Sequence, residues 1–247
     1  MRGSDRSTGT AAGSAVGTVS DGVEGTADRP DQAGSAVTDI YAEPDADPDT
    51  LANLGPLGPM AGTWVGTRGA DVHPAAGDVD GHDAFHERYE LQPIDPQTNG
   101  PQLFYGLRYH AHIVKPGEVE TFHDQVGYWL WEPASATVAF TLAIPRGQVL
   151  LAHGAAAPDA TGFEVTATLG SDTYGILSNP FLGANFRTVS FRMGVSNGAD
   201  GTWSYEEDTM LVVPGRAGLV RHRDTNTLTR VDAPIPNPLA RGEAPTR

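Results

Sequence analysis

From residue 61 onward, short segments rich in aromatic and β-branched residues recur at close spacing along the chain. Turn-forming pairs such as Asn99-Gly100, Pro116-Gly117 and Asn197-Gly198 separate them. No long segment with a helical period lies between them, which argues against parallel β-α-β units. The ten segments that we expect to be strands are 62–67, 85–91, 103–114, 121–131, 137–143, 148–152, 162–169, 186–193, 202–213 and 219–231.

An antiparallel sheet of so many strands must protect its edges, and closure into a barrel removes them. The sequence therefore predicts an all-β fold, a single antiparallel β-barrel of about ten strands. A barrel of this size can hold one small ligand. The apolar segment 50–60 before the first strand is either one turn of helix that plugs the barrel or a plain lead-in to that strand.

The two ends of the chain differ from its middle. Residues 1–50 hold 10 acidic residues and three arginines, with Tyr41 as their one aromatic residue. Such a segment has too little apolar surface to offset its ordering entropy, so we expect a disordered acidic tail. Residues 233–247 hold four prolines and predict a C-terminal tail. The barrel is therefore expected to span residues 51–232.

Composition excludes several classes of site and partner. The chain has no cysteine, so it has no disulfide and no thiolate nucleophile or ligand. It lacks a run of about 18 apolar residues and a secretory signal, so we expect a cytoplasmic protein without a membrane partner. The net charge of −15 argues against nucleic acid as a partner. A homodimer is one assembly that the sequence allows.

A hairpin over residues 103–131 gathers histidines. If Pro116-Gly117 forms a two-residue turn, Val114 pairs with Val119 and His110 pairs with His123. Side chains alternate between faces, so His110, His112 and His123 would then share one face. A one-residue slip would separate His123 from the other two.

This histidine cluster is open to two interpretations. Imidazoles that face a barrel interior could bind Zn, Fe or Cu, or relay a proton. The alternative is a solvated outer face. The acidic run Glu206-Glu207-Asp208 in the expected strand 202–213 also has two interpretations: it could supply a general base, or it could lie in solvent.

Four motifs in order resemble the nitrobindins, a family of haem-binding barrels related to lipocalins and fatty-acid-binding proteins. They are GTWVGTRGADVHP from Gly62, FHDQVGYW from Phe122, IPRGQV from Ile144 and LVRHRDTNTLTRV from Leu219. The resemblance covers roughly residues 54–231. Arg68 stands where the first motif of the family ends in glycine, although Gly69 follows it.

The resemblance implies a function and a set of site residues. Nitrobindins bind haem b in a solvent-open cavity, with the iron held by a histidine of the last strand, which corresponds to His222. His123 matches a histidine on the distal side and is the candidate catalytic residue. The family binds NO and is described as a peroxynitrite isomerase. The other residues that we expect to contact the haem are Trp64, Thr67, Arg68, His110, Ile144 and Arg146.

Each of these residues also has a structural interpretation. Trp64 is equally suited to core packing, and Arg68 and Arg146 to exposed loops that could bind a propionate or another anion. Two alternatives to haem binding stay open. One is a haem-free carrier of a small apolar or anionic ligand, and the other is a non-haem metal site built from His110, His112 and His123.

Overall fold

A computed structural model describes residues 39–77 and 79–242 of the 247-residue chain. The predicted disordered tail falls mostly on residues 1–38, which lie outside the described residues. The elements, in chain order, are α1 (Thr50–Asn53), η1 (Gly55–Met60), β1 (Gly62–Ala75), β2 (Val79–Pro93), β3 (Gln97–Asn99), β4 (Gln102–Val114), β5 (Thr121–Glu132), β6 (Thr137–Ile144), β7 (Gln148–Ala155), β8 (Gly162–Thr168), β9 (Ile176–Ser178), α2 (Pro180–Asn185), β10 (Arg187–Asn197), β11 (Thr202–Val212) and β12 (Val220–Asp232).

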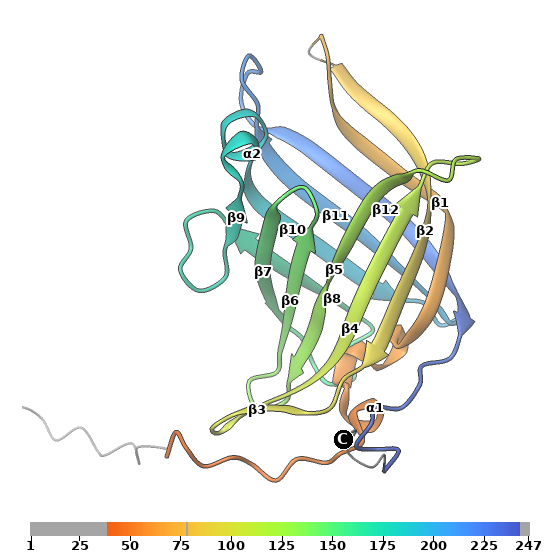
Figure 1. Cartoon of the computed structure of the whole chain (residues 1–247), viewed down its shortest axis with the longest axis vertical. Helices are drawn as coiled ribbons and strands as arrows, with labels where there is room; N and C mark the ends of the chain where they lie inside the picture. The colour runs from red at the N-terminus through yellow and green to blue at the C-terminus, as the bar shows by residue number, and fades with distance from the viewer. Residues whose placement is uncertain (1–38, 78, 243–247) are drawn as a thin grey trace, which may run out of the picture. The chain divides into compact units, whose positions relative to one another are not determined.

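The strands form a closed antiparallel barrel (Figure 1). Neighbours follow the order β2-β1-β12-β11-β10-β8-β7-β6-β5-β4, and a further pairing of β2 with β4 closes the ring. Ten strands therefore make up the barrel, as the hydrophobic pattern predicts. The short strands β3 and β9 lie outside this ring, paired with β4 and β7.

The seam between β7 and β8 is the weakest in the ring. The two strands share one paired position, His153 with Thr166. The first half of β7 pairs instead with β9, from Gln148 with Ser178 to Leu150 with Ile176. Helix α2 follows β9 directly, at the upper end of the barrel in Figure 1. Near this end, β9 and α2 therefore complete the wall where β8 does not pair with β7.

Large aromatic side chains fill the lower half of the barrel. The rings of Trp129 and Phe140 lie 4.2 Å apart, and Tyr89 lies 5.2 Å from both Tyr109 and Trp203. None of these five side chains is more than 2 % exposed. Because interiors are close-packed, truncating one such ring costs about 3–5 kcal/mol.

The apolar segment before β1 is helical and closes the lower end of the barrel, which settles the two interpretations of residues 50–60. Leu54, Leu57 and Met60 are fully buried. The indole Nε1 of Trp64 donates a hydrogen bond to Met60 O at 2.7 Å, which fixes η1 to the first strand. With this plug and the aromatic core below, open space in the barrel is confined to its upper half.

The predicted register of the β4–β5 hairpin is wrong. Val114 pairs with Thr121 rather than with Val119, and a bulge after Ile113 brings this residue opposite His123. Residues 115–120 form a longer loop in which Val119 is 97 % exposed. The shift is by an odd number of residues, so it moves His123 to the face opposite His110 and His112.

No helix in the described part of the chain is long and apolar enough to cross a membrane.

The segments on either side of the barrel meet at its lower end. Asn237 is 1 % exposed, and its amide Nδ2 donates to Pro48 O and to Asp95 Oδ1, both at 2.8 Å. Its Oδ1 accepts a hydrogen bond from the backbone of Thr50 at 3.2 Å. One side chain after β12 thus ties the segment before β1 to the β2–β3 loop.

We expect Asn237→Ala to lower the free energy of unfolding by about 1–3 kcal/mol, because three hydrogen-bonding groups lose their buried partner. Urea unfolding followed by tryptophan fluorescence measures the change. Asn185→Ala is the matched control, since that amide makes a single exposed bond to Phe181 O. Equal stability of the two variants would show that Asn237 does not hold these segments together.

Candidate functional site

A cavity of about 470 Å³ occupies the upper half of the barrel. This volume lies within the range of small-molecule sites. Most of its wall is apolar and is formed by Phe85, Ile113, Phe122, Leu142, Ile144, Leu150, Phe191, Met193 and Leu211. Phe181, Leu182 and Phe186 from α2 and the residue after it line the cavity as well.

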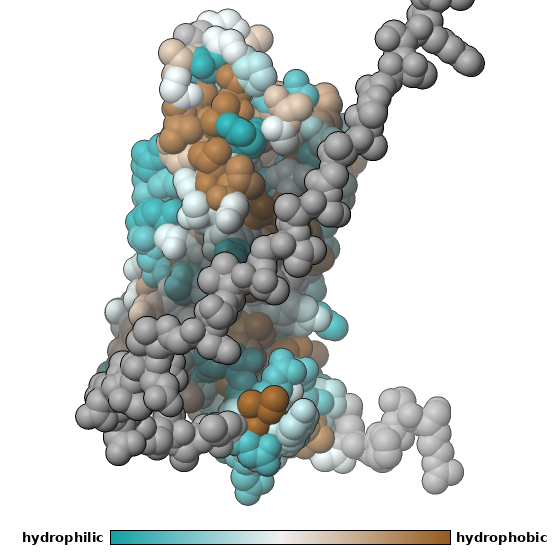
Figure 2. Space-filling view, turned by 90° about the vertical axis from the view of Figure 1, so that its left-hand side faces the viewer, coloured by the Kyte–Doolittle hydropathy of each residue, from teal (hydrophilic) through white to brown (hydrophobic). Residues whose placement is uncertain are grey.

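The rim of the barrel beside the cavity is also apolar. Figure 2 shows a hydrophobic surface over the upper part of the molecule, on the side of β9 and α2. Leu177 and Phe181 are 72 % and 65 % exposed there. Apolar side chains therefore continue from this rim to the cavity wall, since Phe181 belongs to both.

One wall of the cavity is polar, and strand pairing explains its composition. On β11 and β12, Glu207 lies opposite Asp224 and Thr209 lies opposite His222. Asp224 in turn lies opposite Asp71 of β1. Because alternate side chains of a strand share a face, all of these project into the cavity. Three carboxylates therefore stand in a row across β11, β12 and β1, and His222 stands above that row.

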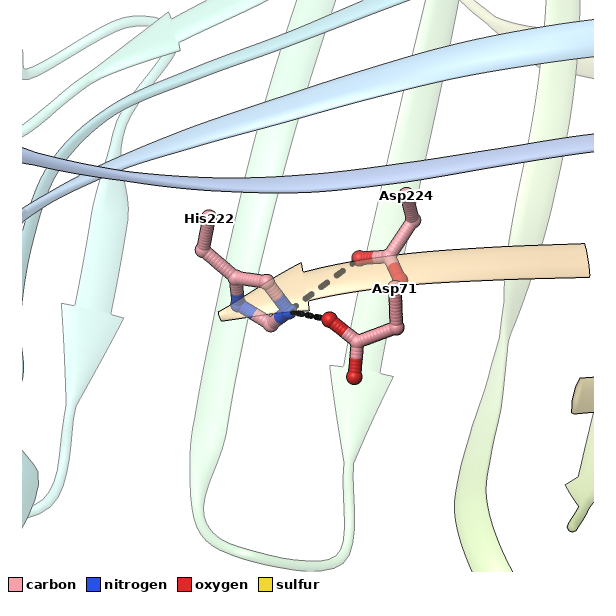
Figure 3. A group of neighbouring side chains, drawn as sticks. All are labelled: Asp71, His222 and Asp224. Atoms are coloured by element: carbon pink, nitrogen blue, oxygen red, sulfur yellow. Dashed lines mark hydrogen bonds and ion pairs between the residues drawn. The ribbon is translucent and has the colours of Figure 1, made fainter. Parts of the chain in front are cut away.

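His222 turns its Nε2 atom toward two of these carboxylates (Figure 3). The distance is 2.9 Å to Asp71 Oδ1 and 3.4 Å to Asp224 Oδ2. His73 lies on the far side of Asp71, with its Nδ1 3.2 Å from Asp71 Oδ2. Asp71 is thus held between two imidazoles.

The pairing of Asp71 with His222 shifts both pKa values. Burial disfavours the charged form of Asp71, but the hydrogen bond and charge of His222, with help from His73, outweigh it and lower the pKa. Burial likewise disfavours the imidazolium of His222, and its hydrogen bond to Asp71, with the charges of Asp224 and Asp71, reverses this and raises the pKa. The two groups therefore favour an ion pair.

The other carboxylates of the wall hold protons more tightly than usual. Burial, followed by the charge of Asp224, raises the pKa of Glu207 to about 8. Burial also raises the pKa of Asp224 to about 6, although His222 acts against it. No hydrogen bond reaches either carboxylate from the residues that the structure describes. The wall thus holds carboxyl groups that its own donors do not satisfy.

Below this row, Glu87 is 3 % exposed. Its Oε2 accepts hydrogen bonds from Tyr205 Oη and Asn226 Nδ2, both at 2.9 Å. A Cβ atom at Gly66 would collide with the side-chain amide of Asn226, so glycine is needed there. Burial nevertheless dominates and raises the pKa of Glu87 to about 7.

The opposite wall carries His123 and Arg146. The guanidinium Nη2 of Arg146 donates to His123 Nδ1 at 3.0 Å, because arginine has no acceptor. His123 Nε2 must then carry the proton and donate to Gln125 Oε1, at 3.1 Å. Burial lowers the pKa of His123, and the charges of Arg146 and His222 lower it further. The hydrogen bond to Gln125 acts in the opposite direction but does not outweigh them. The imidazole is therefore neutral and fixed in one tautomer.

The structure places the predicted site residues in two groups. His222, His123, Ile144 and Arg146 line the cavity. Trp64, Thr67, Arg68 and His110, which were also expected to contact the ligand, do not line this cavity.

The reasons are local. Trp64 is 1 % exposed and packs edge-on against Trp203, in the filled half of the barrel. A bulge between Gly66 and Gly69 turns Thr67 and Arg68 to the outer surface.

The predicted three-histidine metal site is also wrong. His110 is on the outer surface and contacts Asp124 at 2.8 Å, and His112 contacts Thr121 Oγ1 at 2.9 Å. His123 points into the cavity from the other face of β5. The outer-face interpretation therefore holds for His110 and His112.

Sequence reasoning missed Asp71, His73, Glu87, Asp224 and, in part, Glu207. Alternation along the last strand could have found Asp224, which lies two residues after His222. The three acids come from separate strands, so their row required knowledge of strand pairing. Of the acidic run in β11, Glu207 alone faces the cavity, whereas Glu206 and Asp208 bind arginines on the outer face.

We expect Glu87→Gln to stabilise the protein at pH 8 by about 1–3 kcal/mol, with little effect near pH 4.5. The folded pKa of about 7 lies above the ordinary value of 4.5. The folded state therefore binds the proton of Glu87 more tightly than the unfolded state does. The unchanged protein loses stability as the pH rises through 7 and Glu87 ionises, whereas Glu87→Gln does not. Urea unfolding across pH 4.5–8.5 tests this, with the exposed Glu120→Gln as control. A pH profile identical to that of the unchanged protein would refute it.

Comparison with known proteins agrees with this geometry. Rv2717c from M. tuberculosis, a crystal structure, is 19 % identical and superposes with a TM-score of 0.51. The match covers 75 % of this chain and 99 % of that chain, and at this identity it shows the fold alone. No curated protein matches the chain. A family model for the THAP4-like, heme-binding beta-barrel domain matches residues 53–230. This chain therefore belongs to the family of THAP4-like, haem-binding β-barrel domains.

Proposed function

We propose that the barrel binds haem b with His222 as the iron ligand, and that the bound haem takes NO or isomerises peroxynitrite to nitrate. One observation carries the proposal. An imidazole of the last strand projects into a cavity of about 470 Å³ whose other walls are largely apolar. Family membership supports haem as the ligand.

The residues present fit a porphyrin. Phe85, Phe191, Leu142 and Leu150 offer flat apolar surface to the ring. The guanidinium of Arg146 can pair with a propionate by charge-assisted hydrogen bonds. His222 can ligate iron through Nε2 once this atom exchanges its hydrogen bond to Asp71 for the metal. Haem held by His222 alone would supply an iron that can bind NO or peroxynitrite.

The chain itself would contribute orientation and hydrogen bonding. Asp71 and Asp224 lie beside His222 and restrict its ring. On the opposite wall, Arg146 can offer its remaining N–H groups to a bound anion such as peroxynitrite or its product nitrate, and His123, which accepts a hydrogen bond from Arg146 Nη2, holds that guanidinium in place. The apolar walls would exclude water from an anion bound beside the haem.

A titration of the full-length protein with hemin tests the haem site. We expect a Soret band that shifts on addition of NO, and we expect His222→Ala to lower hemin affinity at least about tenfold. His110→Ala is the control, because that imidazole lies on the outer surface. Equal hemin affinity in both variants would exclude His222 as the iron ligand.

The role of His123 is tested in the hemin-loaded protein. We expect His123→Leu to slow peroxynitrite decay by about 10²-fold while hemin stays bound, because Arg146 loses the acceptor that orients its guanidinium toward the anion. His112→Leu, on the other face of the hairpin, is the control, and peroxynitrite should decay in its presence at the same rate as with the unchanged protein. Stopped-flow absorbance measures both rates, and no difference between them would contradict this role.

The second candidate function is a haem-free carrier of a small apolar or anionic ligand, which the apolar walls and Arg146 favour. It would replace the haem proposal if hemin fails to bind and the fluorescent anion 1-anilinonaphthalene-8-sulfonate binds in a way that Arg146→Ala weakens.

A further inference from the structure

The surroundings of His222 are unusual for an imidazole that serves a porphyrin alone. Its Nε2 atom faces the carboxylates of Asp71 and Asp224 rather than open space (Figure 3). One ligand atom from each of these three residues lies within 4.8 Å of the others. An imidazole nitrogen and two carboxylate oxygens at this spacing are a set of ligands for a small cation.

The position of the cluster in the barrel makes it a fixed unit. Asp71 and Asp224 are direct partners on β1 and β12, and His222 lies one alternation further along β12 on the same face. All three side chains therefore come from regular, hydrogen-bonded strands. Sites built on such elements hold their ligands more firmly than sites built on loops.

Two carboxyl groups on this wall have no hydrogen-bond donor among the described residues. Asp71 is paired with His222, but Asp224 and Glu207 lie beside it in the Glu207–Asp224–Asp71 row, where like charges opposite each other across a strand pair are destabilising. Arg146 lines the same cavity, but its hydrogen bond goes to His123. Lys115 binds Asp83 at 2.8 Å, outside the row. A divalent cation beside Asp224 would favour the ionised form of these groups.

Unused ligand atoms give an independent indication. The Nδ1 atom of His73 is buried and makes no hydrogen bond within the described residues, although it lies 3.2 Å from Asp71 Oδ2. The carboxylate of Glu207 lines the cavity and likewise has no hydrogen-bond donor there. Polar groups in protein interiors are ordinarily satisfied, and a missing ion is one standard reason for an exception.

We infer that Asp71, His222 and Asp224 bind one divalent transition-metal ion, with His73 and Glu207 beside it. Carboxylates favour Mn²⁺, and imidazole favours Fe²⁺ and Zn²⁺, so the mixed set suits this group rather than a thiophilic metal. A second set, Asp71, His73 and Asp83, is less suitable because Lys115 already neutralises Asp83.

This inference does not rest on the haem proposal, but the two share His222. The Nε2 atom cannot bind a small cation and a porphyrin iron at the same time. The barrel would therefore hold either haem or the divalent ion, and each should weaken binding of the other.

Isothermal titration of the full-length, haem-free and metal-free protein with MnCl₂ tests the site. We expect one Mn²⁺ per chain and at least a tenfold loss of affinity in Asp224→Asn. Asp124→Asn is a closely matched control, because Asp124 also contacts a histidine, His110, at 2.8 Å, but on the outer surface. Thermal melting of each variant verifies folding, and Asp71→Asn serves in place of Asp224→Asn if the latter melts early.

The outcomes separate the two proposals. Weaker Mn²⁺ binding in the cavity variant but not in Asp124→Asn supports the metal site, whether or not hemin binds. No Mn²⁺ binding, or equal binding in both variants, overturns it even if hemin binds normally. Where both ligands bind, saturating Mn²⁺ should raise the apparent hemin dissociation constant at least tenfold, and an unchanged constant also overturns the shared site.

Discussion

Pairing of β2 with β4 closes the sheet, and closure is the constraint from which the rest of this structure follows. In a closed barrel, every second side chain of each strand must enter one enclosed volume. The lower part of that volume is filled with aromatic rings and closed by η1. The upper part is lined rather than filled, so polar residues that alternate inward there become neighbours in a space sheltered from solvent.

Enclosure changes the chemistry of those neighbours. Three carboxylates across β11, β12 and β1 would repel one another on any surface, and in a sheltered wall they also lose water. The protein answers this by pairing Asp71 with His222 and by raising the pKa of Glu207 and Asp224. The opposite wall has the reverse character, with Arg146 beside a neutral His123. The cavity is therefore polarised from one side to the other.

This polarity connects the two proposals. An imidazole on the last strand, apolar walls and an arginine are features that suit haem and a small anion. The same imidazole, placed between two carboxylates, also suits a divalent cation. The position of His222 in the barrel is the same in both proposals. For haem, Nε2 would exchange its hydrogen bond to Asp71 for the iron, whereas for a divalent cation Nε2 and Asp71 would bind the ion together. Membership of the haem-binding family supports haem as a ligand, and the acid row belongs to this chain's own residues.

The sequence by itself determined the number of barrel strands, because alternation and turn residues act over a few neighbours. It left open whether residues 50–60 are helical, and it placed His222 in the cavity only through the resemblance to a family. It did not determine the β4–β5 register, since residues 118–120 leave the ladder and a bulge follows Ile113, and neither has a strong local signal. His123 therefore reached the cavity without His110 and His112. The bulge that turns Thr67 and Arg68 outward was hidden for the same reason. Only the tertiary structure brought Asp71, Asp224 and Glu207 together, because their contact depends on which strands pair, and that is decided by closure of the whole sheet.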